Sequence, residues 1–369
     1  MPNRSSSLPT RRTVTGGLLA LGALPAQSFA ASRPGLYAGT YANEGGAGLV
    51  PLVAAGNGWR AGTAMAAIRN LSFGANGARH RLRYLLDEQQ QGAIGIYDAT
   101  FRKVAGASTK GADPCYVTLN RTGDMLAVAN YSSGSVAIWT LDRATGLLRG
   151  EAQLVRHEGS GPDKERQAAA HAHWVGFTAD GATLHSVDLG ADAVFAHRFE
   201  RTSGHIADTS IAYTAEAGSG PRHLVRHPRM PIAYLVAELA NTVTVLRAST
   251  DGTFAKQAVV STLPADFRGS SAAAHIALNA AGSRLYVSNR GHDSIAVYDV
   301  ARDGGLRLLQ HVGCGGHWPR FFRLLERQGN MLVANQRAGT ITRLPLQRDG
   351  TLGAAGPAVA VPGVAFIGE

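Results

Sequence analysis

Cysteine, lysine and charged residues in general are scarce in this sequence of 369 residues. Only 17% of the residues are charged, four of the 36 basic residues are lysines, and two cysteines, Cys115 and Cys314, lie far apart in the chain. Two cysteines cannot form the disulfide framework on which small secreted domains depend. They could form one disulfide or remain two separate buried thiols, and we expect separate thiols.

Long apolar runs and tracts of one charge are also absent. No stretch reaches the roughly 20 apolar residues needed to span a bilayer, and coiled-coil heptads are missing. The net charge of +10 comes from arginines scattered among acidic residues, whereas nucleic-acid-binding proteins usually gather basic residues on a stripe or tail. We therefore expect a globular protein with no membrane span in its mature chain and no nucleic acid as partner.

The first 30 residues are typical of an export signal. Arg11 and Arg12 precede a moderately apolar stretch, and small residues surround a cleavage site after Ala30. Paired arginines before a weakly apolar core resemble a twin-arginine signal. We predict a twin-arginine signal peptide over residues 1–30, recognised by the Tat translocase, and one periplasmic domain over residues 31–369.

A repeat of short β-rich segments runs through the remaining chain. Each copy has a β-rich run, an acidic or amide anchor residue, a turn and a second β-rich run. The anchors are Glu88, Asn130, Asp188, Glu238, Asn289 and Asn335. With an earlier copy at residues 36–41, their spacing implies seven units of about 48 residues, a length typical of a propeller blade of four antiparallel strands.

We therefore predict an all-β fold, a seven-bladed β-propeller with four antiparallel strands per blade. Three strands per unit are visible in the sequence, and the fourth is inferred from the period. Ring closure removes exposed strand edges. We expect residues 359–361 and residues 364–367 to pair beside residues 36–41 in one closing blade.

The starts of the inner strands supply candidate site residues, because they line one mouth of the channel in a propeller. Arginine offers a fork of donors to carboxylate or phosphate, and histidine can act as a base near neutral pH. Such donors could also stabilise the oxyanion of ester or lactone hydrolysis. The inner-strand candidates are His171, His173, Arg222, His223, His275 and Arg320, and the beginnings of the second strands add Glu238 and Arg290.

These candidates also have alternative roles. His171 and His173 have the spacing of two metal ligands on one strand face, but no third ligand is evident in the sequence, and we predict no metal and no cofactor. Glu238 could tie adjacent blades together, and Arg222 and Arg290 could bind backbone carbonyls between blades. A nucleophile elbow, a phosphate-binding loop and a dinucleotide fingerprint are missing. Loop or strand-surface positions are expected for His157, His185, His197 and His227.

The sequence resembles the seven-bladed 6-phosphogluconolactonase family, also called the lactonase family, which is similar to carboxy-cis,cis-muconate cyclases. The resemblance covers nearly the whole mature chain. It implies a metal-independent enzyme that hydrolyses a sugar lactone or, in the cyclase branch, closes and opens a muconolactone. The most specific stretches are 114–136, 157–173, 219–224, 261–264 and 287–295.

The resemblance also implies a site and a substrate class. The cluster proposed for the cyclases falls on His171 or His173, Arg222, Glu238 and Arg290. Departures from the family pattern gather where a phosphate or sugar hydroxyls would bind. Together with export, they favour an unphosphorylated lactone. The departing residues are Tyr116, His275, His317 and Phe321.

We predict a periplasmic lactone hydrolase, a carboxylic ester hydrolase that acts as a monomer on a small lactone. A general base would activate water, and arginines would hold an anionic group or the oxyanion. Substrate binding is assigned to Arg222, Arg290, His223, His275 and Arg320, and catalysis to His173, Glu238 and His171. A non-catalytic binding or scaffold propeller and a muconolactone-type cyclase stay open as alternatives.

Overall fold

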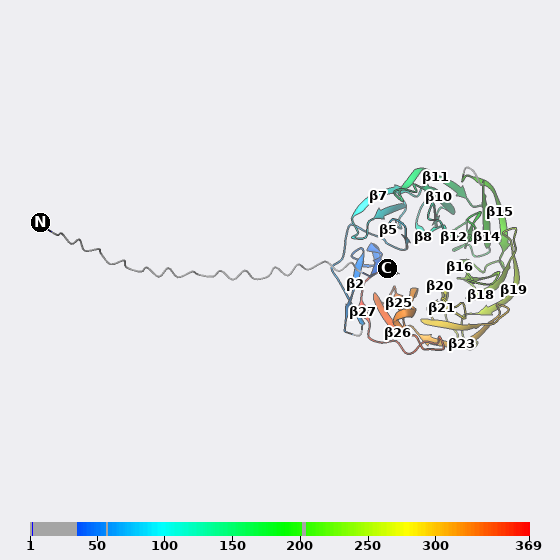
Figure 1. The fold of residues 1–369 in the computed structure, drawn as a ribbon. Coiled ribbons are helices and arrows are strands. Elements are labelled where there is room, and N and C mark those ends of the chain that lie inside the picture. Colours follow the sequence, from blue (N-terminus) through cyan, green and yellow to red (C-terminus); the bar gives the residue numbers. More distant parts are fainter. Residues whose placement is uncertain (1, 3–34, 57, 201–203) are drawn as a thin grey trace. The chain divides into compact units, whose positions relative to one another are not determined.

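The computed structural model describes residues 2, 35–56, 58–200 and 204–369, and residues 35–369 form a ring of seven four-stranded sheets (Figure 1). Neighbouring strands within each sheet are antiparallel. The predicted seven-bladed propeller with four antiparallel strands per blade is thereby confirmed. The predicted leader, residues 1–30, lies outside the described residues except for Pro2.

The strands of each blade follow one another from the channel outward, and blade 1 takes its inner strand from the end of the chain. Blade 1 contains β28 (Val364–Gly368), β1 (Leu36–Thr40), β2 (Val50–Ala55) and β3 (Gly58–Ala61). Blade 2 contains β4 (Gly74–Gly77), β5 (Leu82–Asp87), β6 (Ala93–Tyr97) and β7 (Lys103–Ser108). Blade 3 contains β8 (Pro114–Leu119), β9 (Met125–Asn130), β10 (Ser135–Leu141) and β11 (Leu148–Arg156).

The remaining four blades follow strictly in chain order. Blade 4 contains β12 (Ala172–Phe177), β13 (Thr183–Asp188), β14 (Ala193–Phe199) and β15 (Ile206–Thr214), and blade 5 contains β16 (Pro221–Arg226), β17 (Ile232–Ala237), β18 (Thr242–Ala248) and β19 (Phe254–Ser261). Blade 6 contains β20 (Ala272–Leu278), β21 (Arg284–Arg290), β22 (Ser294–Val300) and β23 (Leu306–Gly313), and blade 7 contains β24 (Pro319–Leu325), β25 (Asn330–Asn335), β26 (Thr340–Pro345) and β27 (Val359–Ala360). Two single-turn 3-10 helices are η1 (Ala42–Glu44) and η2 (Glu326–Gln328).

Burial explains why three strands of each unit were visible in the sequence and the fourth was not. All residues of β9 and β17 are buried, because neighbouring blades cover both faces of these second strands. Strands covered on both faces read as continuous apolar runs. The outer strands β15 and β19 are mostly exposed, so few of their positions need to be apolar. The sequence of an outer strand therefore shows little hydrophobic periodicity.

Closure of the ring differs in part from the prediction. β28 pairs with β1, with Ala38 opposite Ile367, as predicted. The prediction for residues 359–361 was wrong, because β27 pairs with β26 as the outer strand of blade 7. A tight turn containing Gly363, whose φ is +66°, separates the two segments, so consecutive strands enter different blades.

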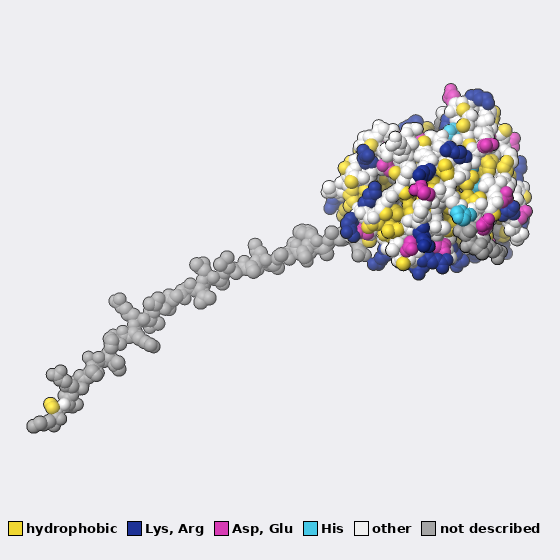
Figure 2. Space-filling view, turned by 90° about the horizontal axis from the view of Figure 1, so that it is seen from above, with side chains coloured by type: hydrophobic (Ala, Val, Ile, Leu, Met, Phe, Trp, Pro, Cys, Tyr) yellow, Lys and Arg dark blue, Asp and Glu magenta, His cyan; other side chains and the backbone are white. Residues whose placement is uncertain are grey.

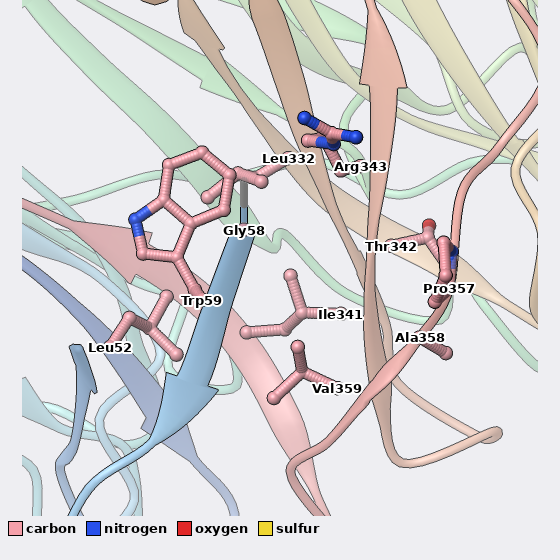
Figure 3. A pocket seen from close by; sticks show the side chains of 10 residues that line it. All are labelled: Leu52, Gly58, Trp59, Leu332, Ile341, Thr342, Arg343, Pro357, Ala358 and Val359. Atoms are coloured by element: carbon pink, nitrogen blue, oxygen red, sulfur yellow. The ribbon is translucent and has the colours of Figure 1, made fainter. Parts of the chain in front are cut away.

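A small apolar cavity marks the outer part of this closure, between blades 7 and 1. Its volume is about 300 Å³, and Figure 3 shows Trp59 on β3 facing Ile341 on β26 and Val359 on β27. Most of the described side chains that line this cavity are apolar, and Arg343 is the one ionisable residue among them. Hydrolysis of an ester requires several ionisable groups close together, so this cavity is a poor candidate for an active site.

Side chains of both charges are mixed on the surface of the propeller (Figure 2). Figure 2 shows Lys and Arg side chains interspersed with Asp and Glu on the visible face of the propeller, with no basic stripe. Among the residues that the structure describes, no helix is long and apolar enough to cross a membrane. Cys115 and Cys314 are both buried free thiols, which confirms the expectation of two separate thiols.

Candidate active site

The turns that follow the second strands place their first residue at one mouth of the channel. In blade 3 the turn lies between the paired residues Asn130 and Ser135, and in blade 6 between Asn289 and Ser294. The last turn residue has a positive φ in blades 3 to 7, which is why Gly, Asn or Asp stands there. These last residues are Gly134 at 53°, Asp192 at 50°, Asn241 at 53°, Asp293 at 56° and Gly339 at 61°.

This register corrects two details of the sequence analysis. The residues that close the hairpins are Asp87, Asn130, Asp188, Ala237, Asn289 and Asn335. The proposed anchors Glu88 and Glu238 therefore lie one position later than the other four anchors. The first turn residues are Glu88, Tyr131, Leu189, Glu238, Arg290 and Gln336, and they follow or complete the second strands instead of beginning them. Ends of second strands and starts of inner strands meet at the same mouth because the strands are antiparallel.

β-Bulges at the starts of the inner strands supply the other mouth residues. In β16, Pro221 pairs with Ala237 and His223 with Val236, which leaves Arg222 as the extra residue. A bulge of this kind re-aims the side chain of the extra residue. The corresponding extra residues are Cys115 in β8, His173 in β12 and Arg320 in β24.

Glu238 lies at the centre of a buried cluster of arginines. Its Oε1 is 2.6 Å from Nη2 of Arg166, and its Oε2 is 2.7 Å from Nη2 of Arg290 and 3.0 Å from Nε of Arg222. Arg222 also donates to the carbonyl of Ala274 in the next blade, and Arg290 donates to the carbonyls of β20. The proposed roles of Glu238 in tying blades together and of Arg222 in binding a carbonyl between blades are therefore confirmed. The proposal was wrong for the carbonyls that Arg290 binds, because β20 and β21 belong to the same blade.

The charges of this cluster are unequal. Burial raises the pKa of Glu238, but the adjacent charges of Arg290 and Arg222 outweigh burial and hold the pKa well below its usual range. Burial and the neighbouring Arg290 lower the pKa of Arg222 to about 9, and burial also lowers the pKa of Arg290. In addition, Nε of Arg222 makes no hydrogen bond. The cluster therefore has more positive charge than Glu238 balances, which favours an anion or a developing oxyanion.

His171 has the geometry of a base with a defined tautomer. Its Nδ1 lies 3.1 Å from the carbonyl oxygen of Tyr131, and its ring stacks on the Tyr131 ring at 4.6 Å. A carbonyl oxygen can only accept, so Nδ1 of a neutral His171 carries the proton and Nε2 carries the lone pair. His171 is half-buried, and its Nε2 is the basic nitrogen left for water.

A buried chain of hydrogen bonds fixes the backbone at His171. Oδ1 of Asp188 accepts from the backbone N–H of His171 at 2.7 Å, and Oδ2 lies 2.8 Å from Nδ1 of His157. Ser186 then joins Nε2 of His157 at 3.0 Å to Nε2 of His197 at 2.8 Å. The Asp188, His157 and Ser186 side chains resemble a hydrolytic triad, but all three are buried, and Asp188 holds the backbone of His171.

The surface positions expected for His185 and His197 are wrong, whereas His157 lies in a loop, as expected, although its side chain is buried. His157, His185 and His197 are buried, whereas His227 is half-buried. Burial lowers the pKa of His185 to about 4 and that of His197 to about 3. Their neighbours provide the reason for burial, since His185 lies 2.7 Å from the carbonyl of Gly252 and also contacts Arg226.

His173 lies deeper than His171. Its ring is packed edge-on against Tyr131 and His223, and its Nδ1 lies 3.6 Å from Sγ of Cys115. Burial and the charge of Arg222 hold the pKa of His173 well below its usual range. His173 is consequently neutral at physiological pH and forms part of the wall between the mouth and the channel.

The other side of the mouth is a cavity of about 560 Å³. Glu88 lines it together with Tyr41 of blade 1 and Arg320 of blade 7. The Tyr41 hydroxyl lies 2.9 Å from Oε2 of Glu88, whereas Nη2 of Arg320 is 4.0 Å from Oε1. The guanidinium of Arg320 also acts electrostatically on Glu238, so both carboxylates belong to one mouth.

A layer of seven rings closes the channel beneath the mouth. Every blade contributes one ring, from the inner strand or the residue just before it, and neighbouring centroids lie as close as 4.0 Å for Phe73 and Tyr116 and 4.3 Å for His275 and Phe321. Contacts across the centre join Phe73 to Phe321 and Tyr116 to His223. The seven rings are Phe73, Tyr116, Trp174, His223, His275, Phe321 and Phe366.

This layer contains two of the predicted substrate-binding residues. His223 and His275 line a second cavity of about 570 Å³ on the opposite side, and that cavity shares no residue with the one at Glu88. The structure thus gathers six predicted residues at the mouth and places these two below it. The six residues are His171, His173, Arg222, Glu238, Arg290 and Arg320.

Four residues of the mouth were missed in the sequence. Glu88 and Tyr131 could have been found from their equivalence to Glu238 and Arg290 in the repeat, had the anchors been aligned one position later. Tyr41 ends the earlier copy at residues 36–41 and follows β1 as Glu88 follows β5, so the same alignment could have found it. Arg166 comes from a segment outside the repeat and carried no signal. Within the described ranges, no three His, Cys, Asp or Glu side chains are grouped as ligands for a metal ion.

Comparison with known proteins agrees with this fold over nearly its full length. The family described as "Lactonase, 7-bladed beta-propeller" matches residues 35–367. The 6-phosphogluconolactonase of Bacillus subtilis (strain 168) is 31% identical over 286 residues, which cover 75% of this chain and 80% of that protein.

Solved structures show the same architecture. The periplasmic gluconolactonase PpgL of Pseudomonas aeruginosa is 26% identical with a TM-score of 0.82, and the match covers 90% of this chain and 97% of that one. A putative 6-phosphogluconolactonase from Bacteroides fragilis is also 26% identical, with a TM-score of 0.78 over 90% of this chain and 96% of that one.

Proposed function

Because this chain belongs to the seven-bladed β-propeller lactonase family, we propose that it hydrolyses a lactone in the polar mouth of its channel. The observation that carries the proposal is the excess positive charge around Glu238 beside the half-buried base His171. Hydrolysis of an ester needs water activated by a base and donors for the oxyanion. The mouth supplies both.

His171 activates the water molecule in this proposal. Nε2 of its Nδ1-protonated tautomer accepts a proton from water while the water oxygen attacks the lactone carbonyl. Glu238 is a poor base because three arginines bind its carboxylate. His173 is buried and contacts the rings of Tyr131 and His223. We therefore assign it a role in positioning these neighbours, without contact with water.

The arginines stabilise the negative charge that develops on the carbonyl oxygen. Arg166 and Arg320 have side chains that are 39% and 18% exposed, whereas those of Arg222 and Arg290 are 3% and 7% exposed. We assign contact with substrate to the first pair and long-range electrostatic support to the second pair. A fixed positive potential of this kind requires no metal ion.

An unphosphorylated sugar lactone is the proposed substrate class. Phe321 and Tyr116, which depart from the family pattern, belong to the ring layer at the floor of the mouth and offer no cation to a phosphate. The printed name of the Pseudomonas aeruginosa neighbour, a periplasmic gluconolactonase, supports the same choice.

Purified leaderless protein provides the direct test. Proton release is followed on glucono-1,5-lactone, its 6-phosphate and a muconolactone, with and without EDTA, and corrected for spontaneous hydrolysis. We expect EDTA-insensitive turnover that prefers glucono-1,5-lactone. Absence of turnover on every lactone would overturn the proposal and favour a binding propeller.

A variant of the base tests the mechanism. His171→Asn keeps a donor for the Tyr131 carbonyl but removes the basic nitrogen, so kcat should fall about 100-fold or more. His80 is half-buried in the β4–β5 turn, at the opposite end of the strands. His80→Gln should therefore retain the activity of the natural protein, and an active His171→Asn would exclude His171 as the base.

Export to the periplasm remains part of the proposal. A double substitution, Arg11→Lys with Arg12→Lys, should leave the precursor in the cytoplasm, because the twin-arginine route depends on the arginine pair. Arg4→Lys lies in the same leader outside the pair and should not change fractionation. Equal periplasmic yield of the double variant would contradict twin-arginine export.

A further inference from the structure

Two carboxylates reach the mouth from equivalent turn positions but have opposite surroundings. Glu238 in blade 5 has three guanidinium groups within 3.0 Å. Glu88 in blade 2 has the Tyr41 hydroxyl at 2.9 Å and one guanidinium, Arg320, at 4.0 Å. A distance of 4.0 Å is too long for a hydrogen bond, so Arg320 forms only a long ion pair with Glu88.

These surroundings drive the ionisation of the two groups apart. Burial raises the pKa of Glu88, and the charge of Arg320 and the hydroxyls of Ser72 and Tyr41 offset only part of this effect. The nearby carboxylate of Asp113 raises the pKa further. By contrast, Arg290 and Arg222 hold the pKa of Glu238 low despite its burial. Carboxyl groups separated in this way commonly take the roles of acid and anion in one active site.

Access to a ligand also distinguishes the two groups. The Glu88 side chain is 16% exposed and lines the cavity of about 560 Å³, whereas the Glu238 side chain is 4% exposed and does not line it. The same cavity is lined by the guanidinium-bearing Arg320 and by Gln336. A lactone bound beside Arg320 therefore has Glu88 within its cavity.

We propose that Glu88 is the catalytic acid, which protonates the ring oxygen of the lactone as the acyl C–O bond breaks. This inference rests on the proposed lactonase function. His171 takes one proton from water, the water oxygen bonds to the carbonyl carbon, and the carbonyl electrons move to the oxyanion. When the carbonyl re-forms, the ring C–O electron pair leaves with the ring oxygen, which receives the Glu88 proton.

The remaining proton transfers restore the enzyme. The product is a hydroxy acid that ionises to the hydroxycarboxylate, so hydrolysis releases one proton to solvent. His171 loses its proton to solvent, and the Glu88 carboxylate regains one from solvent. Tyr41 acts as a positioning residue, since its hydroxyl holds Oε2 of Glu88.

Leaving-group dependence tests the acid role. Glucono-1,5-lactone expels an alkoxide, which needs a proton, whereas dihydrocoumarin expels a phenolate whose conjugate acid has a pKa of about 10 and needs little help. Glu88→Gln should lower kcat on gluconolactone about 100-fold or more and lower kcat on dihydrocoumarin less than about 5-fold. Equal losses on both lactones would overturn the acid role.

The pH profile gives a second and independent measurement. The alkaline limb of kcat on gluconolactone in the natural protein should reflect loss of the Glu88 proton, and this limb should disappear in Glu88→Gln. An unchanged limb would contradict the inference. Glu88→Asp retains an acid at shorter reach and should recover part of the activity that Glu88→Gln loses.

A matched control separates this inference from the proposed function and from folding. Glu44 lies in the same cavity and binds Gln336, and Glu44→Gln should leave the ratio of the two rates unchanged. Lack of lactone turnover in the natural protein would contradict the lactonase function itself. Turnover by the natural protein and equal turnover by Glu88→Gln would contradict only the role of Glu88.

Discussion

Glu238 and Glu88 contribute to the free energy of unfolding with opposite pH dependence, because their pKa values are shifted in opposite directions. The lowered folded pKa of Glu238 means that its contribution is complete above the unfolded pKa of about 4.3 and is lost as the pH falls. The raised folded pKa of Glu88 means that its contribution is present at low pH and is lost as the pH rises through that pKa.

Matched amide substitutions test this contrast at pH 7. Glu238→Gln leaves three arginines without their shared anion, and the free energy of unfolding should fall by about 3 kcal/mol or more. Glu88→Gln replaces a buried carboxyl group that has no hydrogen-bonded cation and should not lower the melting temperature. Equal melting temperatures for Glu238→Gln and the natural protein would contradict the account of the arginine cluster.

At the scale of the strand, the repeat predicted the architecture but not its register. The alternation of apolar runs and turns was sufficient to place seven blades, because both faces of the second strands are covered. The mouth residues depend on bulges that add Arg222, His173 and Arg320 to their strands. A bulge changes the pairing by one residue and leaves the composition of the strand unaltered. The sequence therefore placed these residues at the starts of inner strands but could not show that bulges aim their side chains.

The closing strand β28 should be essential for the stability of the propeller. Removal of residues 364–369 would leave the edge of β1 unpaired and remove buried Phe366 and Ile367. We expect this truncation to aggregate or lose its cooperative unfolding transition in size-exclusion and thermal measurements. Removal of Glu369 alone breaks its exposed pair with Arg323 and should change the melting temperature little. A monomeric, cooperatively folding truncation would show that closure by β28 is dispensable.

For the whole molecule, buried histidines make stability depend on pH. Burial lowers the pKa of His185 to about 4, and the pKa of His197 and of His275 to about 3. Each is neutral when folded but becomes protonated when unfolded below about pH 6.5. Their contribution is therefore present above pH 6.5 and is lost as the pH falls, by roughly 1.4 kcal/mol per pH unit for each histidine.

Thermal unfolding from pH 7 to pH 4 measures this effect. The melting temperature should fall steadily over that range, and His197→Gln should show a shallower slope than the natural protein. His80→Gln changes a half-buried histidine, serves as the control and should keep the natural slope. A melting temperature that is constant between pH 7 and pH 4 would contradict the neutral state assigned to the buried histidines.

The layer of seven rings turns the channel into a dead end. A lactone that enters at the mouth cannot pass through to the opposite face, so the hydroxycarboxylate must leave by the route through which the substrate arrived. In the proposed reaction, the excess positive charge that stabilises the oxyanion also attracts this anionic product. Entry of the next lactone consequently waits for departure of the carboxylate, and the rate of exit sets an upper limit on turnover however fast the ring is opened.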